Sequence, residues 1–195
     1  EKNEKVGAIG PELISKDGMR QQSFWRDPTL TNTILSITHL DFLNYKKNYK
    51  NSKFKEGAIV DTLSGGAFFV SREIFNKLNG FDSDLFWMED VDFCIRLRKI
   101  GYKVYFYPRT RIIHFIGKSA EYNYKVAISN QLLSKIKFFK KNHSFSKYFT
   151  ISCIIFIVSL FKTILFGIIA LSSKKNKKKF YAYLYTIRAV VDYEN

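Results

Sequence analysis

The stretch DTLSGGAFFVSREIFNKLNGFDSDLFWMEDVDFCIRLRKIGYKVYFYPRTRIIHFIGKS, residues 61–119, decides the fold of this chain. An acidic cluster, Glu89-Asp90-Val91-Asp92, stands at the start of a helix predicted over 89–100. A double glycine with an apolar run, residues 65–70, precedes the cluster, and a lone histidine, His114, follows it beyond a predicted strand. Small residues, carboxylates at a helix start and a histidine after a strand indicate a site for chemistry.

Strands alternate with helices around this stretch. Strands are predicted over 6–10, 20–25, 58–63, 66–70, 102–107 and 111–115, and helices from 28 to about 43, over 72–78 and over 89–100. Pro11 and Pro108 are predicted to end their strands, and Asp27 to cap the first helix. A polar loop is predicted over 45–55. This interleaving indicates an α/β layer structure.

Further predictions concern the two helices on either side of the acidic cluster. Ser71 is predicted to cap the first of them and Asn79-Gly80 to end it in the left-handed conformation. Gly101 is predicted to end the second helix. Asp92 and Arg96 are four residues apart on that second helix and are predicted to pair on its surface.

The charge of the chain is concentrated in its last third. Residues 1–121 carry 19 Lys and Arg against 15 Asp and Glu, whereas residues 122–195 carry 13 against 2. A basic segment with few acids is suited to the phosphates of nucleic acid or to anionic lipid headgroups. The apolar stretch within it favours lipid, and no nucleic-acid-binding motif is present. The two cysteines, Cys94 and Cys153, form neither a disulfide framework nor a metal-type spacing.

Three helices are predicted in the basic segment, over 122–142, 151–171 and 180–191. The middle one has 21 residues and is long enough to span a bilayer. Its polar residues share one side, and lysines crowd both of its ends, which argues against a simple crossing. The prediction is a helix lying in the membrane interface, with a single crossing as the serious rival and a buried core helix as a third reading.

Two readings of the acidic cluster are open from the residues alone. The plain one is helix-start charge on a solvated face, kept ionised by the helix dipole. The functional one rests on Phe86 and Trp87, which offer a sugar ring a stacking surface beside a carboxylate that accepts a hydroxyl proton. For His114, a satisfied structural histidine and a ligand for a divalent cation or a phosphate are equally open.

The order of these motifs resembles the acceptor half of family 2 glycosyltransferases, in the rhamnosyltransferase-like branch that builds bacterial surface polysaccharides. The resemblance covers roughly residues 5–120. The matching positions are Gly66-Ala67, Arg72-Glu73, Gly80-Phe81-Asp82, Glu89-Asp90-Val91-Asp92, Arg96, Gly101-Tyr102, Pro108, and His114 with Gly117 and Ser119.

The resemblance implies the C-terminal part of a GT-A fold, a mixed sheet with flanking helices, and an inverting transfer from a nucleotide-sugar donor. It implies that Asp90 is the general base and that Glu89 holds the acceptor or orients the base. Gly66 and Ala67 would let the backbone approach the donor sugar. Trp87, with Phe86 beside it, would stack on a sugar.

The resemblance also implies a divalent cation, Mg²⁺ or Mn²⁺, with His114 contacting either the metal or the diphosphate leaving group. The nucleotide-binding half of the family, with its Asp-x-Asp motif, has no counterpart before Val6, so metal binding is expected to need residues outside this chain. Asp82-Ser83-Asp84 has the letters of that motif but lies after the acceptor strand, and it is interpreted as a loop.

The sequence therefore predicts two parts. Residues 1–121 would be the acceptor side of a glycosyltransferase, and residues 122–195 a helical region that docks on anionic lipids at the cytoplasmic face of the bacterial inner membrane. The acceptor would be a lipid-linked sugar or a polysaccharide. The alternative is a non-catalytic, membrane-bound module that binds glycan or protein.

Overall fold

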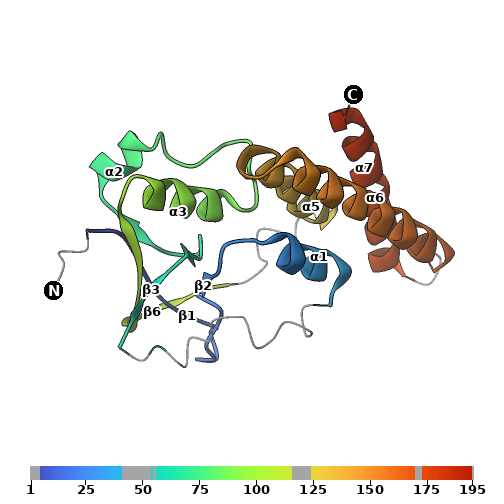
Figure 1. Ribbon diagram of the computed structural model, residues 1–195. Helices are drawn as coiled ribbons and strands as arrows, with labels where there is room; N and C mark the ends of the chain where they lie inside the picture. The colour runs from blue at the N-terminus through green and yellow to red at the C-terminus, as the bar shows by residue number, and fades with distance from the viewer. Residues whose placement is uncertain (1–4, 41–53, 55, 116–123, 170–172, 195) are drawn as a thin grey trace. The chain divides into compact units, whose positions relative to one another are not determined.

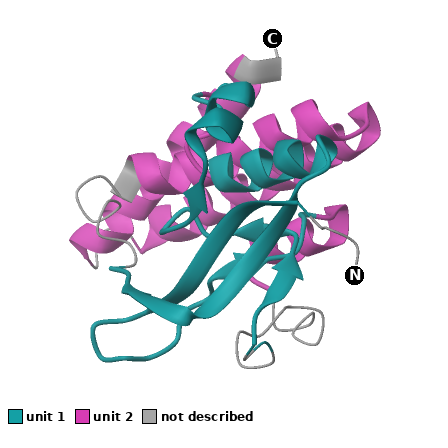
Figure 2. Ribbon diagram, turned by 90° about the vertical axis from the view of Figure 1, so that its left-hand side faces the viewer, with its two compact units in different colours: residues 1–28, 45–83, 88–116 teal, residues 29–44, 84–87, 117–195 magenta. Residues whose placement is uncertain are grey.

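A computed structural model describes residues 5–40, 54, 56–115, 124–169 and 173–194. The chain divides into two compact units, shown in teal and magenta in Figure 2. Unit 1 comprises residues 1–28, 45–83 and 88–116, and unit 2 comprises residues 29–44, 84–87 and 117–195. Most of the loop predicted over 45–55 lies outside the described residues.

Unit 1 is built on a mixed sheet with the strand order β3-β6-β1-β5 (Figure 1). The two long strands, β1 and β6, run parallel, and short antiparallel strands flank them. A second, two-stranded sheet pairs β2 with β4. The bounds are β1 Val6–Ile14, β2 Phe24–Trp25, β3 Ala58–Val60, β4 Thr62–Leu63, β5 Phe69–Val70 and β6 Lys103–Ile113. Strands with helices between them confirm the mixed α/β class.

Both prolines that were predicted to end strands lie inside them instead. Pro11 is in β1, opposite Tyr107, and Pro108 is in β6. The register between the two strands shifts at this point, because the partner of Glu12 is Arg111. Pro108 is among the residues that the shift skips and needs no ladder hydrogen bond, so its missing N–H is tolerated there, whereas Pro11 keeps Tyr107 as its partner. The two strands predicted over 102–107 and 111–115 are therefore one.

Two other strand predictions were too long. The segment predicted as one strand over 58–63 divides at Asp61 into β3 and β4, which belong to different sheets. The segment predicted over 66–70 is extended only at Phe69–Val70, because a turn that includes Gly65 and Gly66 precedes it. The predicted strand over 20–25 is reduced to β2, with Arg20 in an isolated bridge to Ile14.

The helices of unit 1 confirm their predicted signals. Helix α2 spans Arg72–Lys77, and the Ser71 side chain accepts a hydrogen bond from the Ile74 N–H. Asn79 and Gly80 follow it with positive φ, and Gly101 has φ of 89° after helix α3, Glu89–Lys99. The helices and both sheets enclose an apolar core. Its fully buried side chains include Phe24, Leu63, Phe93, Leu97 and Phe106.

Unit 2 contains four helices among its described residues. They are α1 Leu30–Thr38, α5 Tyr124–Asn142, α6 Phe145–Ile168 and α7 Lys174–Glu194. Helix α7 begins earlier than the predicted 180, because the lysine-rich segment after α6 is itself helical. The part predicted as membrane-docking thus shares a compact unit with α1 and residues 84–87.

Helix α1 differs from its prediction at both ends. Thr29, not Asp27, caps it by accepting a hydrogen bond from the Asn32 N–H. Asp27 instead receives Arg98, whose Nη2 lies 2.6 Å from both carboxylate oxygens. The helix ends at Thr38, because His39 adopts φ of 60° and its N–H closes the last turn. An ion pair thus overrides the local capping signal of Asp27.

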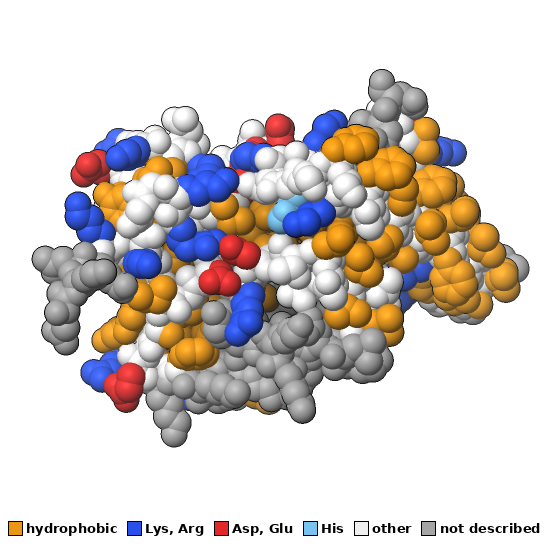
Figure 3. All heavy atoms as spheres, viewed as in Figure 1, with side chains coloured by type: hydrophobic (Ala, Val, Ile, Leu, Met, Phe, Trp, Pro, Cys, Tyr) orange, Lys and Arg blue, Asp and Glu red, His pale blue; other side chains and the backbone are white. Residues whose placement is uncertain are grey.

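The buried residues of α6 are both apolar and polar, since Tyr148, Ile151 and Ile155 are buried as well as two serines. Ser152 and Ser159 are buried within unit 2, and Lys162 is half-buried there. Large apolar side chains are exposed on the C-terminal half, namely Ile157, Leu160, Phe161, Ile164, Leu165 and Ile168. Hydrophobic side chains gather in Figure 3 over the region where Figure 1 draws the end of α6. Among the described helices, only α6 is long and apolar enough to cross a membrane, judged by length and composition.

Candidate active site

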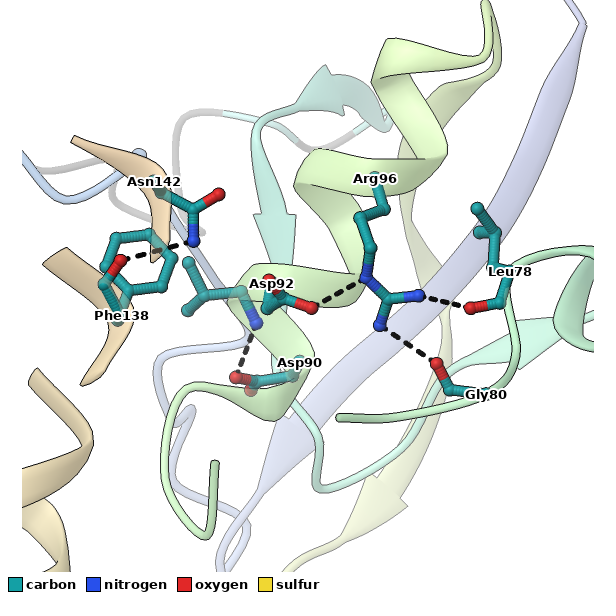
Figure 4. Close-up of polar contacts among 8 residues, drawn as sticks. Leu78, Gly80, Asp90, Asp92, Arg96, Phe138 and Asn142 are labelled. Carbon is teal, nitrogen blue, oxygen red and sulfur yellow. Dashed lines mark hydrogen bonds and ion pairs between the residues drawn. The ribbon is translucent and has the colours of Figure 1, made fainter. Parts of the chain in front are cut away.

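Asp90 connects the start of α3 to the turn at Gly65. Its Oδ2 accepts a hydrogen bond of 2.7 Å from the Gly65 N–H. Its Oδ1 accepts one of 2.8 Å from the Val91 N–H, and this second bond is drawn in Figure 4. Met88 precedes the helix with φ of 77°, and this conformation turns the chain into α3 without a side-chain cap. The carboxylate is thus fixed at both oxygens by backbone donors.

The electrostatics of the two adjacent carboxyls favour the functional reading over solvated helix-start charge. Burial raises the pKa of Asp90, and hydrogen bonds from the backbone of Gly65 and Val91 oppose that shift. Burial also raises the pKa of Glu89, with a smaller upward contribution from the charge of Asp90. The direction is opposite to that expected from the helix dipole alone, because desolvation dominates. A carboxylate with a raised pKa is a stronger proton acceptor.

Glu89 has a carboxylate oxygen that could accept a hydrogen bond from a ligand. Its Oε2 is buried and has no hydrogen-bond partner among the described residues. A buried carboxylate oxygen without a donor is costly, and in native structures such an atom commonly marks a functional position. This fits the predicted role of Glu89 in holding a hydroxyl-bearing acceptor.

The double glycine separates Asp90 from His114. A Cβ on Gly65 would lie 3.3 Å from Asp90 Oδ2, and a Cβ on Gly66 would lie 3.1 Å from Nε2 of His114. Ser64 closes the turn, since its Oγ accepts the Gly66 N–H and its carbonyl accepts the Ala67 N–H. The structure therefore brings three predicted site elements together: the acidic helix start, the glycine turn and the histidine.

His114 is held in one orientation by Gln21. The His114 carbonyl accepts a hydrogen bond from Gln21 Nε2, and His114 Nδ1 lies 3.0 Å from Gln21 Oε1. Because an amide oxygen only accepts, Nδ1 carries the proton. In the neutral ring Nε2 is then an acceptor, suited to a metal or a hydroxyl, and it donates to a phosphate only when the ring is protonated.

The described residues do not form a metal centre. No group of three or more His, Cys, Asp or Glu side chains in this part of the chain is arranged to hold an ion. His114 is one potential ligand without companions of that kind, so the residues described do not fit a divalent cation by themselves. The predicted cation stays a prediction that needs ligands elsewhere.

Arg96 fixes the loop before α3 to the helix. Its Nε donates to Asp92 Oδ2 at 2.6 Å, and its Nη1 and Nη2 donate to the carbonyls of Leu78 and Gly80 at 2.5 and 2.9 Å (Figure 4). The predicted Asp92–Arg96 pair is confirmed, but its predicted place on the surface was wrong, because the Asp92 side chain is 0% exposed. The pair begins two residues after Asp90 and anchors the helix that carries the catalytic candidates.

Phe86 and Trp87 belong to unit 2, where residues 84–87 lie against α5. The Trp87 N–H donates to Ser134 Oγ, and Lys137 Nζ donates to the Asp84 carbonyl. The Phe86 ring is 58% exposed and the Trp87 ring 38%, with the two rings edge-on to each other. Both rings are accessible on unit 2, and their contact with a sugar stays a prediction. Residues 82–84 lie in an irregular segment, as interpreted.

Three site residues were missed from the sequence. Gly65 supplies the donor to Asp90, Ser64 closes the turn, and Gln21 orients His114. The serine directly before the double glycine was a usable turn signal. Gln21 gave none, because it is 93 residues from its partner.

Comparisons with known proteins find similarity over part of the chain. The family model described as the N-terminal domain of galactosyltransferase matches residues 46–118, which contain the glycine turn, the acidic cluster and His114. The matched relatives are then more particular. N-acetylglucosaminyl-diphospho-decaprenol L-rhamnosyltransferase of Mycobacterium tuberculosis, strain CDC 1551 / Oshkosh, is 28% identical over 117 residues, covering 56% of this chain and 38% of that protein. Rhamnosyltransferase WbbL of Escherichia coli K12 is 32% identical over 89 residues, covering 45% of this chain and 33% of that protein.

These similarities confirm the predicted resemblance to rhamnosyltransferase-like glycosyltransferases of bacterial envelope synthesis, over part of the chain. The chain spans only 33% to 38% of the length of these two curated relatives. No solved structure gives a significant match.

Proposed function

We propose that this chain is the acceptor-side part of an inverting, GT-A-type family 2 glycosyltransferase and that Asp90 is its general base. The observation that supports this most is the fixed carboxylate of Asp90, which has a raised pKa and lies beside an open glycine turn. The relatives' names add a rhamnosyl group and a lipid-diphosphate-linked sugar as the candidate donor group and acceptor.

The reaction needs one proton acceptor and one leaving group. In the proposed step, Asp90 takes the proton of an acceptor hydroxyl while the hydroxyl oxygen attacks the anomeric carbon of the donor. The bond from that carbon to the diphosphate oxygen breaks, and the nucleoside diphosphate leaves with the electron pair. Attack opposite the leaving group inverts the anomeric centre. Glu89 would accept a hydrogen bond from a second acceptor hydroxyl through its buried Oε2.

The glycine turn and His114 complete the proposal. Gly65 and Gly66 are exposed, so their backbone is open to a sugar ring. His114 Nε2, directly beyond Gly66, would contact the diphosphate side of the donor, as a donor when its ring is protonated. A divalent cation belongs to the proposal only with ligands outside the described residues.

The experiment is Asp90→Asn in the full-length protein, assayed for transfer of labelled L-rhamnose from its nucleotide donor to an N-acetylglucosaminyl lipid diphosphate. Turnover should fall by about a hundredfold or more, because general-base catalysis contributes that much. Asp84→Asn, an exposed aspartate of the preceding loop, is the matched control and should leave turnover unchanged.

Circular dichroism must show that Asp90→Asn folds. A folded Asp90→Asn protein with near-normal turnover removes Asp90 from the role of base. Absence of transfer in the wild type with any nucleotide sugar supports the alternative of a non-catalytic binding module.

Unit 2 is proposed to place the enzyme at the cytoplasmic face of the membrane. The exposed apolar side chains on the C-terminal half of α6 and the exposed lysines at the start of α7 support this placement. Apolar surface next to basic residues is typical of a helix that lies in an anionic interface. Docking there would bring a soluble nucleotide sugar and a lipid-linked acceptor to one site.

A further inference from the structure

We propose that Lys162, together with His39 and Tyr183, forms a binding site for the phosphate group of a membrane lipid. The three side chains come from three different parts of unit 2: helix α6, the residue that ends α1, and helix α7. This site is separate from the catalytic candidates of unit 1. It rests on the proposed membrane docking of unit 2 and is independent of sugar transfer.

Lys162 is a cation in an apolar helix. It is half-buried, and the side chains of α6 on either side of it in the sequence include the exposed Phe161, Ile164 and Leu165. Its Nζ lies 2.6 Å from His39 Nε2 and donates to the Tyr183 hydroxyl at 3.3 Å. It also lies 5.0 Å from the centre of the Tyr183 ring. All of these partners are uncharged acceptors, provided that His39 is neutral.

The charge of Lys162 is not balanced within the described part of the chain. No Asp or Glu there forms an ion pair with it. An ammonium has three donors, and the contacts to His39 and Tyr183 use two. Taking a cation partly out of water without a counter-ion is costly, so a half-buried ammonium with a donor to spare favours an anion.

A second lysine extends the positive potential. Lys179 lies over the Phe166 ring, 4.8 Å from its centre, and Phe166 stacks on Tyr183 at 5.9 Å with the ring planes 4° apart. Two stacked aromatic rings, one from α6 and one from α7, thus connect the two lysines. The chemistry of such a row fits a phosphate, which carries more charge and more acceptor oxygens than a carboxylate.

The apolar side chains near Lys162 distinguish a lipid phosphate from a free phosphate ion as the ligand. Large apolar side chains are exposed on α6 both before and after Lys162 in the sequence, so a ligand that reaches its ammonium from that side also meets hydrocarbon surface. A free phosphate gains nothing from that surface, whereas a lipid buries acyl or prenyl chains on it. The structure therefore favours a lipid phosphate over a soluble one.

The test compares two single-charge variants of the full-length protein by vesicle co-sedimentation. Phosphatidylcholine vesicles, whose headgroup phosphate is neutralised by choline, measure docking on a zwitterionic surface, and the same vesicles with phosphatidic acid add an anionic phosphate monoester. The gain in affinity that phosphatidic acid brings should be at least tenfold smaller for Lys162→Gln than for the wild type, since the substitution removes a specific charged contact. The matched control is Lys175→Gln, which removes an exposed lysine of α7 and should lose only about fivefold, as expected for one surface charge.

Two further arms keep the result decisive. Tyr183→Phe removes one hydroxyl and keeps every charge, so it should weaken phosphatidic acid binding severalfold without unfolding the protein, even if Lys162→Gln fails to fold. Inorganic phosphate, at the same concentration as the lipid phosphate, should not release the wild type. Equal losses in Lys162→Gln and Lys175→Gln, unchanged binding in Tyr183→Phe, or release by inorganic phosphate would each overturn the site. None of these readouts depends on sugar transfer, so they are informative whether or not the proposed activity is correct.

Discussion

Gly66 and His114 are in such close contact that a methyl group on residue 66 would lie 3.1 Å from Nε2 and from Cδ2 of the imidazole. The same added carbon would lie 3.1 Å from Leu13 Cδ1. The ring is tied to Gln21 on its other nitrogen, so it has little freedom to move away. The requirement for glycine at position 66 thus comes from packing on the histidine as much as from access to a ligand.

Gly66→Ala should therefore destabilise the protein by about 1–2 kcal/mol, the usual cost of overpacking. It should also shift the ring NMR signals of His114, which is one of three histidines in the chain. The double variant Gly66→Ala/His114→Ala should recover part of the loss in urea denaturation, because the ring that the methyl group meets is gone. Fully additive losses would show that the ring is not the obstacle.

The pH dependence of stability should report the environment of Asp90. Burial raises the pKa of this carboxyl in the folded state, so the folded protein binds the proton more tightly than the unfolded chain. Its contribution to stability is then fully present below the unfolded pKa and is lost as the pH rises through the raised folded pKa. Denaturation of wild type and Asp90→Asn over this range should show the advantage of the wild type shrinking as the pH rises.

Glu89→Gln should show the same trend with pH, because burial raises the pKa of Glu89 in the same direction. If wild type and Asp90→Asn keep a constant difference at all pH values, Asp90 is not desolvated. In the enzyme assay, the same raised pKa should place the acidic limb of kcat/KM above the range of an ordinary aspartate, since the base acts only when deprotonated.

Arg96 should be a polar residue of α3 whose loss costs far more stability than that of a surface residue. Arg96→Ala leaves the fully buried carboxylate of Asp92 without its ion-pair partner and frees the carbonyls of Leu78 and Gly80, which should lower the free energy of unfolding by about 3 kcal/mol. Arg96→Lys keeps the charge but cannot reproduce the fork of donors, and should cost about 1 kcal/mol. Urea denaturation measures both.

The matched control for Arg96 is Lys99→Ala on the same helix. Lys99 is exposed, so its removal should change stability by less than about 0.5 kcal/mol. Comparable losses in Arg96→Ala and Lys99→Ala would mean that the hydrogen bonds of the guanidinium contribute nothing measurable.

The in-plane placement of α6 can be tested by cysteine labelling in intact cells. Lys77→Cys reports on unit 1 and Lys175→Cys on the first turn of α7, both at exposed positions and in a Cys153→Ser background. If α6 lies in the interface, a membrane-impermeant thiol reagent should label neither cysteine until the cells are permeabilised. Labelling of one cysteine but not the other in intact cells would mean that α6 crosses the membrane.

Local signals in the sequence were enough to locate the candidate site, because its parts depend on short-range chemistry. The Ser71 cap, the Asn79-Gly80 stop and the acidic start of α3 were all predicted and are present. The hydrogen bond from Gly65 to Asp90 was not predicted. The two residues are 25 positions apart, and the sequence does not determine which distant residues come into contact.

The prolines and the cap of α1 show where local rules gave way. Pro108 lies within β6 because the register shift between β1 and β6 skips it, so its missing N–H leaves no ladder position unfilled, whereas Pro11 lies within β1 opposite Tyr107. Asp27 was a sound N-cap by propensity, but the ion pair with Arg98, 71 residues away, takes its carboxylate instead. Both outcomes depend on distant parts of the chain.

The exposed apolar side chains on the C-terminal half of α6 mean that fold and location can be damaged independently. Phe161, whose side chain is 65% exposed, could be replaced by glutamine with little effect on unfolding, yet the protein would lose apolar surface for the bilayer. Such a variant should be about as thermally stable as the wild type, and its soluble yield should be higher. It would be defective only in the cell, where the proposed docking of unit 2 on the membrane would be weakened.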